Sequence, residues 1–367
     1  MLTILHTESS AGWGGQEIRI VQESLGMTKK GHKVIIAAPE HSNIYKRSNE
    51  VNIYTLPSDF KKTPVSVLKI VSLINKEHPD IVNTHSSSDS WVATVAAKLS
   101  RVKPKVIRTR HLSTPISKSY FSRLLYEILP DAVITTGEEI RQRMMQDNRF
   151  DPSKIFSIPT GIDLERFNPA KVTPAFQSKG FSVGTVGVLR SWKGHKYLLQ
   201  AILSISAVIP NAFFYIVGNG PQYNNLKKLA ETLNVTDSVI FLGHREDIPE
   251  VIASFDVIVH PSYQNEGVPQ SILQAMAMKK PVVASDAGSI KEVVINSKTG
   301  FLIRSRDSHL IAEKVIELYH NSQLRINFGN EGRKLVENNY TLDGMIEKME
   351  TLYEGLLRKR ERSVVAS

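Results

Sequence analysis

Residues 181–209 read FSVGTVGVLRSWKGHKYLLQAILSISAVI. The apolar run at 181–186 is typical of a buried strand, and the spacing of apolar residues over 195–209 predicts a helix. Between them lies a loop, residues 187–194, that contains two glycines and two cations. A strand, a loop and a helix in this order form half of a βαβ unit, which predicts a parallel sheet covered by helices.

The same alternation extends in both directions along the chain. Strands are predicted at residues 2–6, 33–38, 51–56, 81–84, 106–110 and 132–136 before this segment, and at 212–217, 239–242, 257–260 and 281–284 after it. Further helices are predicted at residues 16–30, 64–78, 88–101, 119–129, 222–233, 268–278 and 308–319, and the stretch 324–357 is predicted to be helical throughout. The pattern indicates an α/β protein with doubly wound parallel sheets, whose ligands bind beyond the carboxyl ends of the strands.

The alternation pauses at residues 157–180, where three prolines and two glycines gather. The chain has 367 residues, which is longer than the about 250–300 at which a single hydrophobic core stops growing. We therefore predict two domains, residues 1–168 and residues 169–340, followed by a helical segment at 341–367.

The composition excludes several classes of protein. A hydrophobic content of 41% is enough to bury large cores, which excludes a disordered chain. The absence of cysteine excludes a disulfide scaffold, a thiolate zinc site and a cysteine nucleophile. The 46 Lys and Arg residues against 36 Asp and Glu give a net charge of +10, for which nucleic acid, an anionic membrane surface and a phosphorylated substrate are the candidate partners.

Part of this charge lies in one acid-free stretch. Residues 90–126 contain no Asp or Glu, and the basic region 98–123 within them contains eight Lys and Arg residues. The predicted helix 119–129 adds an apolar and aromatic face. This combination suits an anionic membrane surface, and equally a core-facing helix with solvated cations. Basic residues interleaved with stacking aromatics are absent, so we expect no nucleic-acid partner.

The sequence contains no signal for secretion or for a membrane span. Residues 1–15 have neither a basic nor an apolar leader region, and we expect them to form the first strand. No apolar run approaches the about 20 residues that a membrane-spanning helix needs. We therefore expect a cytoplasmic protein, and the basic region leaves open a peripheral position on the inner face of the cytoplasmic membrane.

Two glycine-containing loops could hold an anion. Gly14 and Gly15 open the first predicted helix, where backbone N–H groups suit an anion, although a tight turn explains them equally well. Arg190 and Lys193, in the loop 187–194, suit a diphosphate, against the alternative of a solvated loop. Neither loop matches the dinucleotide-binding pattern or the P-loop pattern.

Further polar side chains follow other predicted strands. Glu266, in the segment 261–270, can accept hydrogen bonds from hydroxyl groups, and Gln270 and Gln274 share one face of the helix that follows it. This set suits a ligand with many hydroxyl groups, and also a capping acid with exposed glutamines. His111 follows a strand, as does His85 one unit earlier, and such a histidine is either a ligand-contacting group or an ordinary loop residue. No metal-binding motif occurs, so we expect no metal site.

In order and spacing, these segments resemble those of the retaining glycosyltransferases of family 4. The resemblance covers nearly the whole chain, and its residues are Gly14–Gly15, 158–163 with Phe167, Lys193–Gly194, 218–221, Pro261–Ser262, Glu266–Gly267, 274–277, 281–285, Glu292 and Thr299–Gly300. It implies the GT-B fold, in which two Rossmann-like domains with doubly wound parallel sheets face a deep cleft. It also implies that the helix 341–367 packs back on the first domain.

The family resemblance assigns a role to each candidate residue. Lys193 with Arg190 would neutralise the diphosphate of a nucleotide-sugar donor in place of a metal, so no cofactor is expected. Glu266 would contact the donor sugar, Gln274 the ribose, and His111 the transferred sugar. The other expected donor-binding residues are Gly14, Gly15, Gly218, His244, Arg245, Gly267, Val268, Pro269 and Gln270. The acceptor would be a glycan or a lipid-linked glycan in cell-envelope polysaccharide or lipopolysaccharide synthesis, held by loops such as 58–63 and 111–119.

Two positions depart from the family pattern. Gln274 stands where the family has a second glutamate, and Val188 stands where it has an arginine. These departures keep two alternatives open: a weak or inactive GT-B protein that binds nucleotide sugars as a scaffold, and a GT-B nucleotide-sugar epimerase. The sequence does not indicate the oligomeric state, the sugar or the nucleobase.

Overall fold

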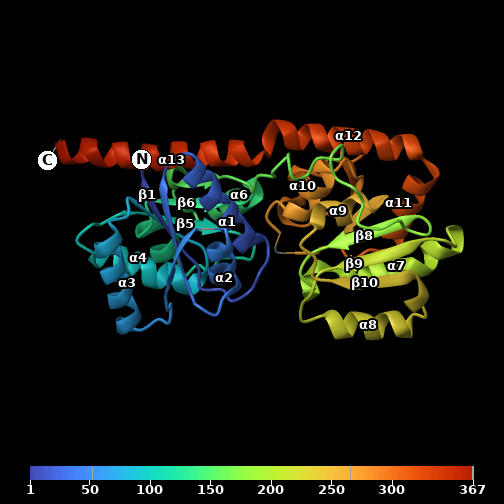
Figure 1. Ribbon diagram of the computed structural model, residues 1–367, viewed down its shortest axis with the longest axis horizontal. Coiled ribbons are helices and arrows are strands. Elements are labelled where there is room, and N and C mark those ends of the chain that lie inside the picture. The colour runs from blue at the N-terminus through green and yellow to red at the C-terminus, as the bar shows by residue number, and fades with distance from the viewer. Residues whose placement is uncertain (52, 265, 366–367) are drawn as a thin grey trace. The chain divides into compact units, whose positions relative to one another are not determined.

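The computed structural model describes residues 1–51, 53–264 and 266–365, which divide into two compact units (Figure 1). Unit 1 contains Met1–Thr160 and the C-terminal segment from Leu342, and unit 2 contains Gly161–Thr341. The boundary expected at residue 168 falls inside unit 2. The reason is that Phe167 and Ile162 are buried in the core of unit 2, and Ile162 also pairs with Thr341.

Unit 1 has a seven-stranded sheet in the order β3-β2-β1-β4-β5-β6-β7, and all its strand pairs are parallel. The strands are β1 (Thr3–Thr7), β2 (Lys33–Ala38), β3 (Tyr54–Pro57), β4 (Ile81–Thr84), β5 (Lys105–Arg110), β6 (Ala132–Thr135) and β7 (Ile155–Ser157). The helices are α1 (Gly15–Lys29), α2 (Asn43–Glu50), α3 (Pro64–Glu77), α4 (Ser87–Leu99), α5 (Tyr120–Arg123), a π-helical turn η1 (Leu124–Ile128), α6 (Glu138–Gln146), a 3₁₀ turn η2 (Pro152–Lys154) and α13 (Leu342–Val365).

Alternate residues of these strands fill two cores, one on each face of the sheet. Ile4 packs in a cluster with side chains of α1 and α13, whereas its neighbour Leu5 packs in a cluster with side chains of α3 and α4. Helix α13 approaches α1 closely at Gly26, where an added Cβ atom would lie 2.6 Å from the Ile346 side chain. The C-terminal helix is therefore part of the core of unit 1 (Figure 1).

Unit 2 has a six-stranded parallel sheet in the order β10-β9-β8-β11-β12-β13. The strands are β8 (Ser182–Val186), β9 (Phe213–Val217), β10 (Val239–Gly243), β11 (Val257–His260), β12 (Val282–Ser285) and β13 (Gly300–Ile303). The helices are α7 (His195–Val208), α8 (Tyr223–Thr232), α9 (Ile248–Ala253), α10 (Gln270–Ala277), α11 (Ser308–His320) and α12 (Ser322–Asn339), with 3₁₀ turns η3 (Ser191–Lys193), η4 (Thr236–Ser238) and η5 (Gly288–Glu292).

In both sheets the strand order reverses beside the first strand. In unit 1, β1 lies between β2 and β4, and in unit 2, β8 lies between β9 and β11. Ligands of doubly wound sheets bind at the carboxyl ends of the strands at this reversal. Each unit is thus the Rossmann-like doubly wound sheet that the sequence predicted.

Several predicted helices have different bounds in the structure, and three of these differences are the clearest. The stretch 324–357 is broken at Tyr340 and Thr341, because the chain there passes from unit 2 back to unit 1. The helix predicted to begin at Val268 begins at Gln270, since the residue before a proline disfavours helical geometry. The predicted helix 119–129 consists of α5 and the π-helical turn η1. No helix in the described ranges is long and apolar enough to cross a membrane.

Candidate functional site

In unit 2, glycines allow four loops to pack closely at the carboxyl ends of the strands. Gly218 has a φ of +135°, and a Cβ atom there would lie 2.0 Å from the carbonyl oxygen of Gly187. The N–H of Gly218 also donates to the carbonyl oxygen of Gly243, at 2.7 Å. Gly194 has a φ of +71° and packs equally closely on the carbonyl oxygen of Pro261. The loops after β8, β9, β10 and β11 therefore form one connected surface.

Lys193 and Glu266 form the charged centre of this surface. The Lys193 Nζ lies 2.7 Å from Glu266 Oε1, and the two side chains are 21% and 8% exposed. Burial acts to raise the pKa of Glu266, but the Lys193 ammonium and the His260 ring outweigh it and lower that pKa. Glu266 is therefore ionised at neutral pH. Because Lys193 carries three N–H donors, it can bind phosphate oxygens while still paired with Glu266.

Two buried histidines lie around this ion pair. His260, the last residue of β11, has its Nε2 3.7 Å from Glu266 Oε1 and 3.1 Å from Ser262 Oγ. His195 opens α7 directly after Gly194, and its Nδ1 has no hydrogen-bond partner in the described part of the chain. Burial lowers the pKa of His195 to about 3, and the charge of Lys193 adds to this effect. His195 therefore stays neutral beside the cation.

Arg190 does not join Lys193. Its side chain is exposed, and its guanidinium lies 5.1 Å from the centre of the Trp192 ring. Within the residues described, no hydrogen bond or ion pair joins the guanidinium of Arg190 to the side chain of Lys193 or Glu266. The backbone of Arg190 instead shapes the loop, because its carbonyl oxygen accepts the N–H of Lys193 at 3.1 Å.

The remaining donor-binding candidates of unit 2 lie on the same edge of the sheet. His244 and Arg245 follow β10, and the Arg245 guanidinium makes two hydrogen bonds to Asp247, at 2.8 and 2.5 Å. Gly267, Val268 and Pro269 are buried between Glu266 and the start of α10. Gln270 and Gln274 are half-buried in the first turns of α10. Asn265, within the predicted segment 261–270, lies outside the described residues.

In unit 1, the glycine loop after β1 lies over buried carboxyl groups. The N–H of Gly14 donates to Glu17 Oε2 at 2.9 Å, and Gly15 begins α1. Ser86 Oγ donates to Glu8 Oε1 at 2.5 Å, and Gln16 bridges Glu8 and Ser86. With Glu8 and Glu17 this close, the loop favours a ligand with hydroxyl groups over an anion.

Asp89 of α4 completes this carboxyl cluster. It accepts hydrogen bonds from Thr7 Oγ1 at 3.0 Å and from the His85 N–H at 2.9 Å, and it is fully buried. Burial raises the pKa of Asp89 to about 8, and the nearby charge of Glu8 acts in the same direction. Asp89 is therefore mostly protonated at neutral pH.

We expect Asp89→Asn to reduce the dependence of stability on pH. The pKa of Asp89 is higher in the folded chain than the 3.8 expected after unfolding, so the folded state binds the extra proton between about pH 4 and 8. Stability contributed by this group is thus lost as the pH rises, at up to about 1.4 kcal/mol per pH unit. Urea unfolding of D89N at pH 6 and pH 8 should show a smaller difference than the wild type. The exposed Asp147→Asn is the matched control, and an unchanged difference in D89N would contradict this account.

His111 is the end of a chain of three histidines in unit 1. Its Nε2 lies 3.1 Å from His85 Nδ1, and His85 Nε2 lies 3.0 Å from His6 Nδ1. The three residues come from the ends of β5, β4 and β1, which are neighbours in the sheet. Burial lowers the pKa of all three, so the imidazoles are neutral at pH 7.

The chain of histidines ends at a buried polar cluster. His6 Nε2 lies 3.8 Å from Glu23 Oε1, and Glu23 Oε1 accepts a hydrogen bond from the Tyr353 hydroxyl of α13 at 2.6 Å. Arg19 lies on the other side of Glu23, with 3.9 Å between Arg19 Nε and Glu23 Oε2. Sequence reasoning noted His85 but missed His6 and Glu23. The available signal was a histidine at the carboxyl end of each of three predicted strands.

The basic region 98–123 is partly neutralised by acids that follow it in the sequence. Asp131 pairs with Lys105 at 2.9 Å and lies 3.8 Å from Lys98. Glu127 pairs with Arg123. The expected amphipathic face is also divided, because Tyr120 and Phe121 are exposed whereas Leu125 and Tyr126 are buried. Membrane association through this region stays a prediction.

No group of three or more His, Asp or Glu side chains is arranged to hold a metal ion in residues 1–51, 53–264 and 266–365. Metal independence itself stays a prediction.

Comparison with known proteins identifies the family of the chain. The family model for glycosyl transferases group 1 matches residues 169–335, and the model for Glycosyltransferase Family 4 matches residues 13–166. The chain is 31% identical over 306 residues to the UDP-Gal:alpha-D-GlcNAc-diphosphoundecaprenol alpha-1,3-galactosyltransferase of Escherichia coli, with 78% of each chain covered. It is 26% identical to the capsular polysaccharide biosynthesis glycosyltransferase CapM of Staphylococcus aureus, with 91% of this chain and 93% of CapM covered.

Solved structures show the same fold. HepE of Anabaena, in complex with UDP and glucose, matches with a TM-score of 0.85 and 20% identity over 96% of this chain and 100% of that chain. The two family models cover the two units in succession, and the relative from Escherichia coli covers most of both. The chain belongs to glycosyltransferase family 4.

Proposed function

We propose that the chain is a retaining, metal-independent glycosyltransferase that moves a sugar from a nucleotide-diphosphate sugar to a lipid-linked glycan. The observation that carries this proposal is the pairing of Lys193 with the buried, ionised Glu266 at the strand-order reversal of unit 2. A cation at this position suits a diphosphate leaving group, and a carboxylate beside it suits sugar hydroxyls.

The relatives support the substrate classes. The relative from Escherichia coli is named for a UDP-sugar donor and a lipid-linked acceptor, and CapM is named for capsular polysaccharide biosynthesis. We extend these classes to this chain and place its reaction in cell-envelope polysaccharide synthesis, with lipopolysaccharide as the alternative product. The donor sugar and nucleobase are left to experiment.

In the proposed reaction, the acceptor hydroxyl oxygen bonds to the anomeric carbon on the face from which the nucleoside diphosphate departs. The bond between that carbon and the phosphate oxygen breaks, and the hydroxyl proton passes to an oxygen of the leaving diphosphate. Lys193 stabilises the charge that develops on the diphosphate, and Glu266 holds the sugar by its hydroxyls. His111 contacts the transferred sugar, the role that the family resemblance assigns to it.

The test is a panel of nucleotide sugars incubated with the full chain and lipid-linked glycans, with and without EDTA. We expect one donor to release nucleoside diphosphate at a rate that EDTA leaves unchanged, and the product to keep the anomeric configuration of the donor in its NMR spectrum. Loss of activity in EDTA that added divalent cations restore would refute metal independence, and an inverted product would refute retention. Binding of donors without turnover would favour the scaffold, and an epimerised free nucleotide sugar would favour the epimerase.

The scaffold alternative rests on Gln274 and Val188, and one substitution addresses the first of these residues. We expect Gln274→Glu to lower the donor KM about fivefold, because hydrogen bonds to a charged group are stronger by about 1 kcal/mol than neutral ones. The measurement is the donor KM at saturating acceptor, with the exposed Gln323→Glu of α12 as the control. A donor KM that is unchanged or higher in Q274E would show that this side chain does not hold the ribose.

A further inference from the structure

Two arginines of unit 1 have no acidic partner. Arg108 and Arg110 are alternate residues of β5, and both donate to the Tyr126 hydroxyl, at 2.8 Å from Arg108 Nη2 and 2.5 Å from Arg110 Nη1. The Arg108 guanidinium also lies 4.1 Å from the centre of the Tyr126 ring. In the described part of the chain, no Asp or Glu forms an ion pair with either arginine. Both guanidinium groups thus contact the Tyr126 hydroxyl, and Arg110 Nη2 also donates to Thr114.

Arg108 also retains unused donors. It is 6% exposed, and its Nε and Nη1 atoms are buried without a hydrogen-bond partner among the described residues. A buried charged group with unsatisfied donors is costly, so such donors indicate a ligand with acceptor oxygens. Burial lowers the pKa of Arg110, and the charge of Arg108 adds to this effect, so an anion would relieve both groups.

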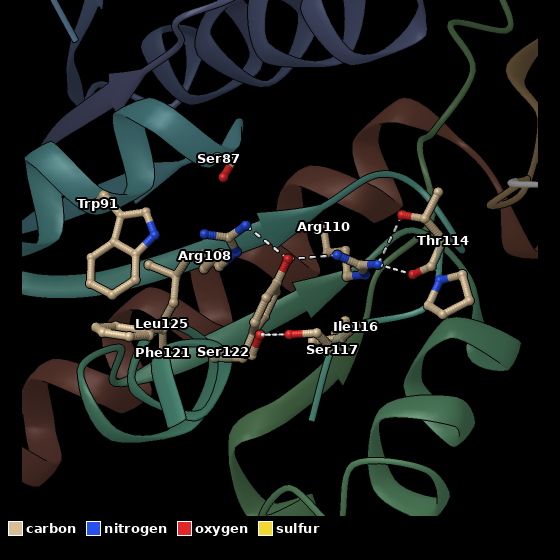
Figure 2. A pocket seen from close by; sticks show the side chains of 12 residues that line it. Ser87, Trp91, Arg108, Arg110, Thr114, Ile116, Ser117, Phe121, Ser122 and Leu125 are labelled. Carbon is tan, nitrogen blue, oxygen red and sulfur yellow. Dashed lines mark hydrogen bonds between the residues drawn. The ribbon is translucent and has the colours of Figure 1, made fainter. Parts of the chain in front are cut away.

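Both arginines line a cavity of about 250 Å³ (Figure 2). Figure 2 shows Arg108 and Arg110 between an apolar wall of Trp91, Phe121 and Leu125 on one side and Thr114 on the other. Phe121 packs edge-on against Trp91 and is still 68% exposed. The volume is below the about 300 Å³ of the smallest pockets for drug-sized ligands, so the cavity suits a phosphate group better than a whole nucleotide sugar.

A larger cavity of about 670 Å³ also reaches the N-terminus of α4. Ser87 of α4 lines the smaller cavity, and the next residue, Ser88, lines the larger one. The larger cavity contains Glu40, Asp59 and Lys61, which suit a ligand with hydroxyl groups. The expected acceptor loop 58–63 contributes to the larger cavity, and the loop 111–119 contributes to the smaller one.

We propose that Arg108 and Arg110 bind the phosphate or diphosphate of a lipid-linked acceptor, whose hydrocarbon chain lies on Trp91 and Phe121 and whose glycan enters the larger cavity. The partial positive charge at the N-terminus of α4 adds to the attraction for the phosphate. The acceptor role rests on the proposed function, whereas the binding of a lipid phosphate in unit 1 does not.

The experiment measures binding by calorimetry, on the full chain, of three probes: farnesyl diphosphate, farnesol and inorganic diphosphate. We expect farnesyl diphosphate to bind most tightly, and Arg110→Gln to weaken it at least about tenfold through loss of a charge-assisted contact. Arg123→Gln is the matched control, because Arg123 is exposed in α5 and pairs with Glu127. Lys193→Ala removes the donor-site cation and should leave this binding unchanged, which separates the inference from the proposed function.

A second variant tests the apolar wall without disturbing the core. Phe121→Ser should weaken farnesyl diphosphate and leave inorganic diphosphate unchanged, and it should melt like the wild type because Phe121 is exposed. Equal affinity for farnesol and farnesyl diphosphate would show that the diphosphate does not contribute to binding. Equal affinity for inorganic and farnesyl diphosphate would show that the hydrocarbon chain does not contribute to binding. Loss of farnesyl diphosphate binding in Lys193→Ala but not in Arg110→Gln would show that the probe does not bind at Arg108 and Arg110.

Discussion

Replacing Lys193 by alanine is expected to lower the rate constant of nucleoside diphosphate release by about 10²–10³-fold, the typical cost of removing one group that stabilises a developing charge. The ammonium of Lys193 is the cation that the structure pairs with Glu266, whereas the Arg190 guanidinium makes a cation–π contact with Trp192. We therefore expect no second cation of this loop to substitute for it. The measurement is nucleoside diphosphate release at saturating donor, with the exposed Lys196→Ala of α7 as the control.

The same substitution also removes the partner of a buried charge. Breaking a buried ion pair costs about 3–5 kcal/mol, and we expect about 3 kcal/mol here because Lys193 is one-fifth exposed. Glu266 would then be buried without its main stabilising charge. A loss of activity in Lys193→Ala alone thus leaves two explanations, failure of catalysis and failure of folding.

The double variant Lys193→Ala/Glu266→Gln separates these explanations. Removing the carboxylate charge relieves the unpaired Glu266, so urea unfolding of the double variant should show most of the lost stability restored. Its rate of nucleoside diphosphate release should stay as low as in Lys193→Ala. Recovery of the rate together with stability would show that Lys193 acts only by compensating the buried charge of Glu266.

The sheets were predictable because their strands are buried on both faces. Ile4 packs into one core and its neighbour Leu5 into the opposite one, and Ile81 and Val82 do the same. Each strand is therefore a short continuous run of apolar residues. Strand β7 has only three residues, which is too short a run for the sequence to reveal. The four residues of β13 follow directly from a turn and were not predicted as a strand. Helix α6 buries only Ile140 and Met144, which is too few for a helical period to stand out.

The candidate site was predictable residue by residue but not as an arrangement. Lys193 and Glu266 were each singled out by local sequence, but they meet because β8 and β11 are neighbours at the reversal of strand order. Arg190 was grouped with Lys193 because it is close in sequence. The cation–π contact with Trp192 shows that sequence proximity in a loop does not fix the direction of a side chain.

The composition of the basic region does not predict which of its cations are neutralised in the fold. Residues 90–126 contain no acid, yet Asp131 and Glu127 lie just beyond this stretch and pair with three of its cations. A parallel sheet places Asp131, at the start of β6, beside Lys105, at the start of β5. Arg108 and Arg110 differ from the other cations of the region because both contact the Tyr126 hydroxyl at a cavity, and this difference is visible only in three dimensions.

His85→Ala is expected to lower the rate of sugar transfer about tenfold. Removing a residue that orients a metal-bound histidine lowers activity by about 10–100-fold, and we take the lower end for His85, which orients His111 by the same kind of hydrogen bond. Glu23, 3.8 Å from His6 Nε2, favours a proton on that nitrogen. His6 Nδ1 then accepts from His85 Nε2, His85 Nδ1 accepts from His111 Nε2, and the Nδ1 of His111 is left as an acceptor for a sugar hydroxyl. His85 is thus a positioning residue, and its loss frees the ring of His111 to turn.

Two measurements separate this positioning role from a structural one. Imidazole added to H85A should enter the vacated space and restore part of the rate, whereas it should not affect His32→Ala, which removes a buried histidine of the same unit paired with Glu350. The pH profile should also change. Burial keeps the pKa of His111 low, so the wild-type rate should not fall between pH 8 and 6 through this group, whereas water entering beside His111 in H85A should raise that pKa and bring a loss of rate into this range. A rate that imidazole leaves unchanged, with a flat pH profile and a lower melting temperature, would show that His85 only supports the fold.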